Sequence, residues 1–537
     1  MRPNRFPFLT LAAVLALAAT QAVPVEPSYR SKVWVADNGD GTYRNPILHA
    51  DYSDPDVLRI ADDYYLTASS FNASPGLPIL HSKDLVNWEL IGHAFAAQPP
   101  LDVYRKPGHG NGAWAPSIRR HNGEVFIFYP DPDFGIYMVK ARTPAGPWSE
   151  PLLVKRAKGW IDPCPLWDDD GRAYLVNALA ASRSAMGSTL VVSRMDPDGT
   201  RLLDDGVLVY DGHPQDPTVE GPKFYKRNGY YYIFAPAGGV TGGWQLALRS
   251  RNVFGPYQRK VVLQQGRTAV NGPHQGGWVD TPAGEFWFVH FQDKGPYGRV
   301  VHLQPMKWVD DWPVIGDRGE PVERYRKPAV GRSWPITTPA ESDEFSASQI
   351  GLQWQWHANP QPGWAFPSPA LGALRLYAIP RPEGYRNLWD VPNLLLQKFP
   401  APEFTATAKV TFSAMAVGDQ VGLIVMGMDY ASIGARKTAA GLSVTQTVCK
   451  GASDGNAERD SPPAGRVDAT FYLRVAVSRD ALCRFSYSSD GADFLSAGEP
   501  TAARAGRWIG AKVGLFALTS GQAREYGYAD IDWFRVE

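Results

Sequence analysis

The stretch Asn228-Gly229-Tyr230-Tyr231-Tyr232-Ile233-Phe234 joins a tight-turn dipeptide to a run of aromatic and β-branched residues. Such a dipeptide before strand-forming residues is the strongest short signal for a β-hairpin. Four similar openings occur in the first half of the chain: Asp62-Asp63, Asn122-Gly123, Asp170-Gly171 and Ala283-Gly284. Successive openings lie roughly 50 to 60 residues apart, which is typical of a repeated structural unit.

A second element follows several of these openings. His81-Ser82-Lys83-Asp84-Leu85-Val86-Asn87-Trp88 gives a polar strand end, a turn and an aromatic residue, and the residues from 248 to 257 repeat this arrangement. Two hairpins per unit make a four-stranded blade. The five units therefore predict an all-β fold with a five-bladed β-propeller over residues 23–317, and an aperiodic β-sandwich is the alternative.

The pattern changes beyond residue 317. Residues 318–339 are rich in Pro, Arg and Glu and are predicted to be a linker. Residues 340–537 contain short segments that alternate apolar and polar side chains, which predicts a second domain, a β-sandwich. We expect its closing strand, around 529–536, to pair with a strand near the start of that domain. We also expect an aromatic cluster to pack against the propeller: Trp354, Trp356, Trp364 and Phe366.

The charge balance argues against two classes of partner. Lys plus Arg and Asp plus Glu are 54 each, so the formal net charge is zero, and no basic stripe or acidic tail is present. We therefore expect neither nucleic acid nor a membrane as a partner. The 18 Trp, 24 Tyr and 23 Phe residues suit sheet packing, and they also suit flat apolar platforms for sugar rings.

Residues 1–22 have the pattern of a secretory signal peptide. Arg2 and Arg5 precede an apolar run from 8 to 19, and small residues follow it. This run is short for a helix that spans a bilayer. We therefore expect a secreted or periplasmic protein.

Three cysteines are too few for a disulfide framework. In an oxidising compartment, pairing of Cys449 with Cys483 and two free thiols are equally open alternatives. Cys164 is expected to be a buried packing residue, because no obvious base accompanies it.

Three carboxylates stand at similar places in different repeats. Asp54 lies in Ser53-Asp54-Pro55, Asp162 in Ile161-Asp162-Pro163 and Glu220 in Val219-Glu220-Gly221, each close to a blade-opening strand. The innermost strands of a propeller converge on its axis, so the three side chains would meet at one end of it. Cleavage of a glycosidic bond requires a pair of carboxyl groups. Taken singly, each residue is also an ordinary turn former.

The chain resembles glycoside hydrolase family 43 in a series of short motifs. They follow one another from about residue 43 to residue 317 and imply the same five-bladed propeller. In order, the motifs are Asn45-Pro46-Ile47-Leu48, Asp54-Pro55, Ser69-Ser70-Phe71, Trp114-Ala115-Pro116-Ser117, Ile161-Asp162-Pro163, Glu220-Gly221-Pro222, Gly272-Pro273-His274-Gln275-Gly276 and Tyr297-Gly298-Arg299.

The resemblance implies a role for each carboxylate. Asp54 looks like the general base that activates water, Glu220 like the general acid, and Asp162 like the auxiliary carboxylate. A negatively charged Asp162 is expected to keep Glu220 protonated near neutral pH. The family resembles inverting enzymes, which place a water between base and sugar. Retaining fructan-cleaving propellers are a poorer match, because their Asn-Asp-Pro-Asn motif is absent. A non-catalytic carbohydrate-binding protein is the third hypothesis.

The resemblance also implies contacts with substrate. Phe71 and Trp114 are expected in the wall of the sugar pocket, and Arg299 is expected to donate hydrogen bonds to sugar hydroxyls. His274 is expected near the propeller axis, next to the substrate or as a ligand of a hydrated structural Ca²⁺. The alternative for each is a packed structural residue or a surface charge.

One loop departs from the family pattern. Related β-xylosidases carry a Trp after Ser69-Ser70-Phe71, where this chain has Ala73. We therefore expect an exo-acting, inverting α-L-arabinofuranosidase that releases terminal pentose from plant hemicellulose or its oligosaccharides. A β-1,4-xylosidase or a bifunctional enzyme is the alternative. The C-terminal region resembles the sandwich of exo-acting members, which partly closes their pocket.

Overall fold

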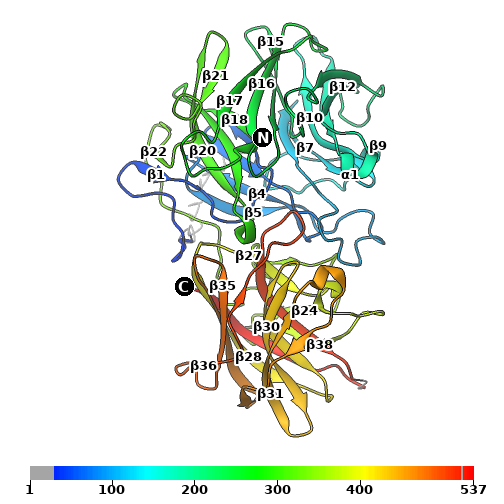
Figure 1. Ribbon diagram of the computed structural model, residues 1–537, viewed down its shortest axis with the longest axis vertical. Coiled ribbons are helices and arrows are strands. Elements are labelled where there is room, and N and C mark those ends of the chain that lie inside the picture. Colours follow the sequence, from blue (N-terminus) through cyan, green and yellow to red (C-terminus); the bar gives the residue numbers. More distant parts are fainter. Residues whose placement is uncertain (1–28, 522–523) are drawn as a thin grey trace, which may run out of the picture.

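The computed structural model describes residues 29–521 and 524–537 of the chain. It contains two all-β bodies, of which the blue-to-green part of the chain forms the first and the yellow-to-red part the second (Figure 1). The predicted signal peptide, residues 1–22, lies outside the described residues. Within those residues, no helix is long and apolar enough to cross a membrane.

The first body is a five-bladed β-propeller, which confirms the prediction. Each blade is a four-stranded antiparallel sheet whose neighbours follow chain order. The first strands of neighbouring blades contact one another around the axis. Blade by blade, the strands are β2 (Asp56–Ile60), β3 (Asp63–Thr67), β4 (Gly76–Ser82) and β5 (Trp88–Phe95); β6 (Ser117–His121), β7 (Glu124–Asp131), β8 (Gly135–Ala141) and β9 (Leu152–Arg156); β10 (Trp160–Trp167), β11 (Ala173–Leu179), β12 (Thr189–Met195) and β13 (Val207–Asp211); β14 (Lys223–Arg227), β15 (Tyr230–Ala237), β16 (Trp244–Ser250) and β17 (Gln258–Gln264); β18 (His274–Asp280), β19 (Phe286–Asp293), β20 (Arg299–Val309) and β21 (Trp312–Ile315). Two short helical turns, α1 (Ala181–Ser184) and η1 (Gly295–Tyr297), lie between strands.

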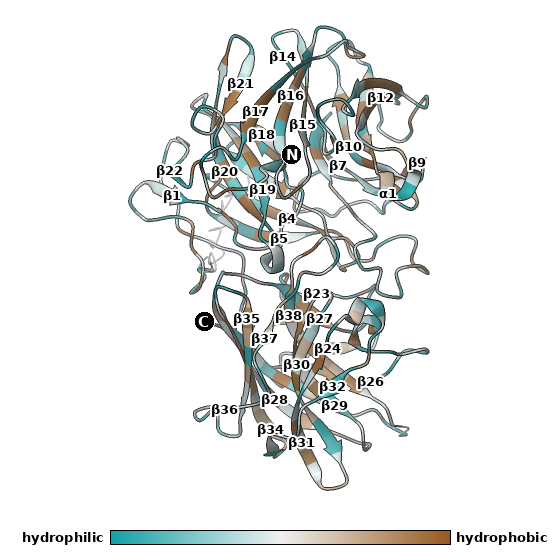
Figure 2. Ribbon diagram, in the orientation of Figure 1, coloured by the Kyte–Doolittle hydropathy of each residue, from teal (hydrophilic) through white to brown (hydrophobic). Residues whose placement is uncertain are grey.

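The repeated dipeptides form the hairpin turns that they predicted. Arg227 of β14 pairs with Tyr230 of β15, so Asn228 and Gly229 make a two-residue loop. Their φ values of 50° and 73° are both positive, as a tight hairpin turn of this kind requires. Figure 2 shows hydrophobic residues, in brown, on strands of both bodies.

The ring of blades is closed by packing and by one extra strand pair. Val57 of blade 1 and Val279 of blade 5 belong to the same buried hydrophobic cluster. Outside the blades, β1 (Thr42–Arg44) pairs antiparallel with β22 (Arg324–Arg326). The segment predicted to be a linker therefore contributes a strand to the propeller.

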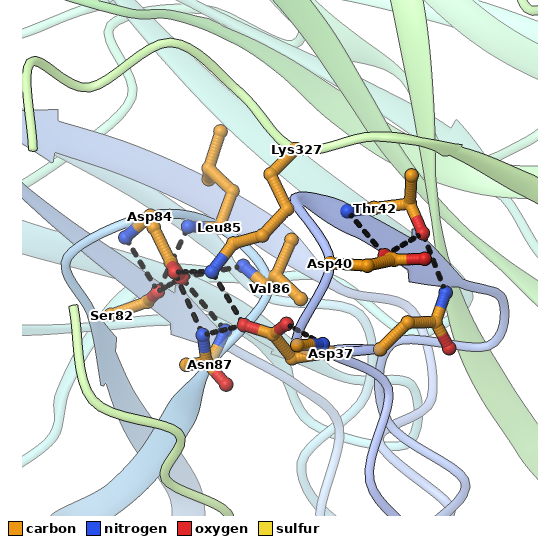
Figure 3. Close-up of polar contacts among 11 residues, drawn as sticks. Asp37, Asp40, Thr42, Ser82, Asp84, Leu85, Val86, Asn87 and Lys327 are labelled. Carbon is orange, nitrogen blue, oxygen red and sulfur yellow. Dashed lines mark hydrogen bonds and ion pairs between the residues drawn. The ribbon is translucent and has the colours of Figure 1, made fainter. Parts of the chain in front are cut away.

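A buried charge cluster supports this closure. Lys327 follows β22 and places its Nζ 2.5 Å from Asp37 Oδ2 and 2.7 Å from Asp84 Oδ2 (Figure 3). Asn87 donates hydrogen bonds of 2.8 Å to both carboxylates. Asp84 and Asn87 lie in the β4–β5 turn, so the cluster ties the two ends of the propeller sequence to blade 1. We call Asp37, Asp84, Asn87 and Lys327 the clasp.

The second body is a β-sandwich, as predicted. One sheet has nine strands and the other has eight. The closing strand pairs with two strands of the same domain, β25 and β28, which confirms the expected pairing near the start of the domain. The nine-stranded sheet contains β23 (Gln355–Trp356), β26 (Ile379–Pro380), β27 (Leu395–Lys398), β29 (Gln420–Met426), β30 (Tyr430–Thr438), β31 (Gly441–Cys449), β32 (Arg459–Asp460), β33 (Gly465–Val467) and β38 (Lys512–Thr519); the eight-stranded sheet contains β24 (Ala365–Ser368), β25 (Ala373–Tyr377), β28 (Phe404–Ser413), β34 (Thr470–Val477), β35 (Leu482–Ser488), β36 (Leu495–Ser496), β37 (Thr501–Ala502) and β39 (Tyr528–Val536). Two short helical turns, η2 (Leu388–Asp390) and η3 (Ala452–Asp454), lie between these strands.

The expected aromatic contact with the propeller is only partly present. Trp356 forms a backbone bridge with Ser74 of the propeller, and Trp364 packs on Trp356. Trp354 instead lies in the core of the sandwich. Phe366 is 52% exposed, because its strand β24 is the edge strand of its sheet. The prediction was wrong for these last two residues.

Tyr297 of the propeller makes the deeper contact between the domains. Its ring is buried in the core cluster of the sandwich. Its hydroxyl oxygen accepts a hydrogen bond of 3.1 Å from Ala481 N and lies 2.8 Å from the carbonyl oxygen of Pro402. A side chain of the propeller therefore lies inside the core of the sandwich at this point.

The three cysteines are free, buried thiols. Cys449 lies on β31 and Cys483 on β35, in different sheets, so the disulfide that the sequence left open does not form. Cys164 accepts hydrogen bonds from Arg119 Nη2 at 3.0 Å and Phe224 N at 3.2 Å. It is a packing residue, as expected.

Candidate active site

The three predicted carboxylates line one cavity of about 390 Å³. Asp54 directly precedes β2, Asp162 lies near the start of β10, and Glu220 stands shortly before β14. Each is therefore near the start of the innermost strand of its blade, and the convergence of these strands brings the three side chains together. The sequence separation between them is no obstacle to a common site.

The backbone is unusual at two of these positions. Asp54 and Asp162 have φ values of 55° and 57°, in the left-handed region. At Asp162 the pairing of β10 with β11 shifts between Ile161 and Cys164. A side chain in this conformation costs on the order of 1–3 kcal/mol and is over-represented at functional sites. The strain turns both carboxylates out of the regular strand pattern.

Asp54 is held by three donors. Its Oδ2 accepts hydrogen bonds from Ser53 Oγ at 2.8 Å and Ser69 Oγ at 2.6 Å. Its Oδ1 lies 3.0 Å from Arg299 Nη1. The side chain is buried at the cavity wall, so these contacts fix the direction of its lone pairs. This arrangement suits a carboxylate that takes a proton from a positioned water.

Asp162 is the most deeply enclosed of the three. Burial and the negative charge of Glu220 raise the pKa of Asp162 to about 8, against a single opposing hydrogen bond from Gly221 N at 2.7 Å. The raised pKa of Asp162 shows that the two carboxyl groups are coupled electrostatically, as we expected from the sequence. That Glu220 is the protonated member of the pair stays a prediction.

Glu220 receives one contact from a buried histidine. His274 Nε2 lies 3.0 Å from Glu220 Oε1, and the imidazole is fully buried. His274 does not line the sugar cavity, so it positions Glu220 rather than forming the cavity wall. Its expected role as a substrate contact is therefore not supported.

The metal expectation for His274 depends on its other nitrogen. His274 Nδ1 is buried and has no hydrogen-bond partner. The described residues include no group of three or more His, Cys, Asp or Glu side chains that would hold a metal ion. Calcium takes six to eight oxygen ligands. A protein-built Ca²⁺ site thus does not fit this place, and a hydrated ion would have to supply its shell from water.

Arg299 lies beside Asp54 and lines the cavity. Its Nη1 donates to Ser53 Oγ at 2.8 Å as well as to Asp54, and its guanidinium carbon lies 4.9 Å from the centre of the Phe291 ring. The planar fork is held from one side, in the place expected for a donor to sugar hydroxyls.

Aromatic side chains form the cavity wall, as expected for Phe71 and Trp114. Their ring centres are 6.2 Å apart. A third ring, Trp508, belongs to the sandwich and lies 6.3 Å from Trp114 in an edge-to-face arrangement. The second domain therefore completes the cavity that the propeller begins.

Two family models cover most of the chain. Residues 43–313 match glycosyl hydrolases family 43, and residues 342–537 match the β-xylosidase C-terminal concanavalin A-like domain. The chain belongs to glycoside hydrolase family 43. It is therefore an enzyme that hydrolyses glycosidic bonds.

Individual relatives of this family 43 enzyme carry two activities in their names. A β-xylosidase from Formosa agariphila is 32% identical over 98% of this chain and 97% of its own length. A non-reducing-end α-L-arabinofuranosidase from Bacteroides ovatus is 28% identical over 92% of this chain and 94% of its own. A crystal structure of a family 43 protein from Bacillus licheniformis shares 27% identity and a TM-score of 0.81, and the match covers 92% of this chain and 99% of that one.

Sequence reasoning about this family 43 enzyme missed Trp508. The residue stands in the segment Ala502 to Ala511, which is rich in Ala and Gly and lies far along the chain from the propeller motifs. Its single aromatic residue is the one signal available. It marks a loop tip but does not say against what the tip packs.

Asp51 also escaped the sequence reasoning, and it joins both sides of the cavity. Its Oδ1 accepts a hydrogen bond of 2.9 Å from Arg299 N, and its Oδ2 accepts one of 2.8 Å from Gly510 N. One buried carboxylate therefore fixes the Arg299 backbone and the loop that carries Trp508.

The expectation drawn from Ala73 is not confirmed in this family 43 enzyme. Ala73 is buried and does not line the cavity, whereas Phe71 of the same loop does. Its neighbour Asn72 donates a hydrogen bond of 2.7 Å to His357 O of the sandwich. The loop therefore contacts the second domain as well as the cavity.

Proposed function

We propose that this enzyme removes single pentose residues from the ends of xylan-derived oligosaccharides, with inversion of configuration, and that β-D-xylosyl units are its main substrate. The observation that carries the proposal is the cavity in which Trp114 and Trp508 stand over Asp54, Asp162 and Glu220. A cavity walled by two domains takes the end of a chain more readily than its middle.

The proposed chemistry divides between two carboxyl groups. Asp54, held by Ser53, Ser69 and Arg299, accepts a proton from the water that attacks the anomeric carbon. Glu220, beside Asp162 and held by His274, protonates the departing oxygen. No residue is needed as a nucleophile. Proton NMR of the first-formed sugar tests this, and retention of the substrate's anomeric configuration would contradict it.

The choice of sugar rests on the relatives. The Formosa agariphila protein, named a β-xylosidase, matches nearly the whole chain, and the C-terminal family model is that of β-xylosidases. The α-L-arabinofuranosidase activity that we expected from Ala73 is not confirmed. It remains the second candidate because of the Bacteroides ovatus relative.

The test is a side-by-side assay on an aryl β-D-xylopyranoside and an aryl α-L-arabinofuranoside. We expect a higher kcat/KM on the xyloside. Glu150→Ala, at an exposed glutamate far from the cavity lining, is the control and should match the wild type. A higher value on the arabinofuranoside would establish the second candidate, and no hydrolysis of either substrate would overturn both.

Two further proposals accompany this function. We propose that residues 1–22 are removed on export, so that the enzyme meets hemicellulose outside the cytoplasm; N-terminal sequencing of the exported protein would show a start near residue 23. We also propose that any Ca²⁺ beneath the cavity is held through water, with His274 as its nearest protein group. Chelation that leaves the melting temperature and activity unchanged would argue against such an ion.

A further inference from the structure

A second cavity of about 530 Å³ adjoins the catalytic one. It lies between the η1 turn of the propeller and the sandwich loop before β38, which reaches the propeller in Figure 1. The two cavities share four lining residues: Ser182, Val240, Arg299 and Trp508. Because Arg299 and Trp508 belong to both, a chain that leaves the catalytic cavity can continue directly into the second.

The walls of the second cavity are held by backbone contacts. Ala511 N donates a hydrogen bond of 2.7 Å to Pro296 O, and Met428 N donates one of 3.0 Å to Ala505 O. At Gly510 an added Cβ would lie 2.7 Å from Gly298 N, so the two segments touch closely. The cavity is therefore preformed and needs no loop closure to bind a ligand.

Trp508 lines both cavities, and it does so in an unfavourable backbone conformation. Its φ is 66°, which is unfavourable for a bulky residue, and 49% of its surface remains exposed. At Gly110, beneath it, an added Cβ would lie 2.9 Å from Trp508 Cδ1. A strained, half-exposed aromatic ring on a fixed loop offers an apolar face against which a sugar ring can pack.

Two opposite charges line the cavity without an ion-pair partner. Among the described residues, no carboxylate lies within 4.0 Å of the Arg507 guanidinium and no cation within 4.0 Å of the Asp293 carboxylate. Asp293 Oδ1 accepts a hydrogen bond from Gly295 N, and among the described residues this is the only hydrogen bond of the Asp293 carboxylate. A donor and an acceptor of opposite charge suit a neutral ligand rich in hydroxyl groups, because neither charge repels it.

We propose that this cavity is a subsite for the second sugar of the leaving group, the residue one unit beyond the bond that is cleaved. The first leaving-group sugar lies in the catalytic cavity against the wall that Trp114 and Trp508 form together, and the second lies on the far side of Trp508 with Arg507 and Asp293 on its hydroxyls. The preferred substrates are then oligosaccharides of three or more neutral residues. This inference rests on the proposed hydrolysis of xylosyl units.

The experiment compares kcat/KM for xylotriose with kcat/KM for xylobiose. In the wild type we expect a ratio of about five to ten, the value of one ordinary hydrogen bond in net free energy. Arg507→Ala and Asp293→Ala should each bring the ratio close to one. Arg504→Ala is the matched control, because Arg504 stands on the same loop but outside the lining and pairs with Asp429. It should keep the wild-type ratio.

The outcomes separate this inference from the proposed function. A wild-type enzyme that cleaves xylobiose and xylotriose with equal kcat/KM overturns the subsite and leaves the β-xylosidase function standing. A ratio that stays high in both variants also overturns it. An enzyme that cleaves neither xylo-oligosaccharide but hydrolyses an arabinofuranoside overturns the proposed function first. Circular dichroism and melting temperatures of each variant exclude misfolding as the cause of a lost ratio.

Discussion

Asp54 and Glu220 line the same cavity with very different neighbours, and their replacements should differ accordingly. Glu220→Ala removes the proposed proton donor, which matters most for a poor leaving group. We expect this variant to keep much more activity on an activated aryl glycoside than on an oligosaccharide. Asp54→Ala removes the proposed base, which every substrate would need, so we expect a loss of about 10²- to 10⁴-fold on both.

Steady-state kinetics on both substrate types measure this contrast. Ser53→Ala is a milder companion, because Asp54 keeps its hydrogen bond from Ser69 and its ion pair with Arg299. If a good leaving group restored the activity of Asp54→Ala, Asp54 would have to be the acid and Glu220 the base.

The electrostatic coupling of Asp162 and Glu220 predicts a pH effect for Asp162→Asn. In the wild type, burial and the negative charge of Glu220 raise the pKa of Asp162 to about 8. Because the repulsion between the two carboxylates is mutual, the neutral side chain of the variant no longer opposes ionisation of the proposed general acid. The alkaline limb of the kcat/KM profile should therefore move to lower pH. An alkaline limb that stays in place or moves to higher pH would mean that Asp162 and Glu220 are not coupled electrostatically.

Individual residues were predicted to different degrees. The three carboxylates and Phe71, Trp114 and Arg299 were found because each belongs to a local motif of the propeller strands. Trp508 was not found, because its position follows from how the second domain docks, which no local pattern encodes. The expectation drawn from Ala73 is not confirmed: Ala73 itself does not line the cavity, and its neighbour Asn72 contacts the sandwich.

Among the elements, β1 and β22 carry the closure of the propeller, and the clasp beside them should contribute to stability. Lys327→Met leaves two buried carboxylates without their cation, so we expect a loss of about 3 kcal/mol in the free energy of unfolding. Burial alone would raise the pKa of Asp37, but the hydrogen bonds from Lys327 and Asn87 hold it below its ordinary value. The contribution is therefore present at neutral pH and lost as the pH falls through that lowered pKa.

Chemical denaturation at two pH values measures this effect. Arg324→Met is the control on the same strand pair, because its ion pair with Asp40 is exposed and screened by solvent, so its loss should change stability much less. Equal losses in both variants would mean that the clasp contributes no more than a surface pair.

The elements of the propeller were predictable because the sequence signal of each hairpin lies within a few residues. Asn228 and Gly229 form a turn whatever lies elsewhere in the chain. The strand β22 was assigned to a linker instead, because its partner β1 precedes it by some 280 residues and its own side chains are exposed. Long-range pairing of a short polar strand leaves no periodic signal.

At the scale of the whole molecule, the propeller should not function without the sandwich. A chain that ends at Gly331 keeps β22 and the clasp but exposes Tyr297, whose ring lies in the sandwich core, and loses Trp508. We expect it to aggregate or, where it stays soluble, to lose most of its kcat/KM on oligosaccharides. Size-exclusion chromatography and the kinetics of the soluble fraction decide between these. A monomer with unchanged kinetics would contradict the dependence on the second domain.

The place of Trp508 in the chain also sets an order in time. A ribosome adds about 5–20 residues per second, so Trp508 emerges roughly 15 to 60 s after Glu220, which precedes it by almost 300 residues. During that interval the nascent chain already carries every catalytic carboxyl group but has only one side of the cavity. Synthesis that stops during this interval yields a protein with all three carboxyl groups but with an open cavity. We therefore expect full activity to depend on one of the last loops to be synthesised.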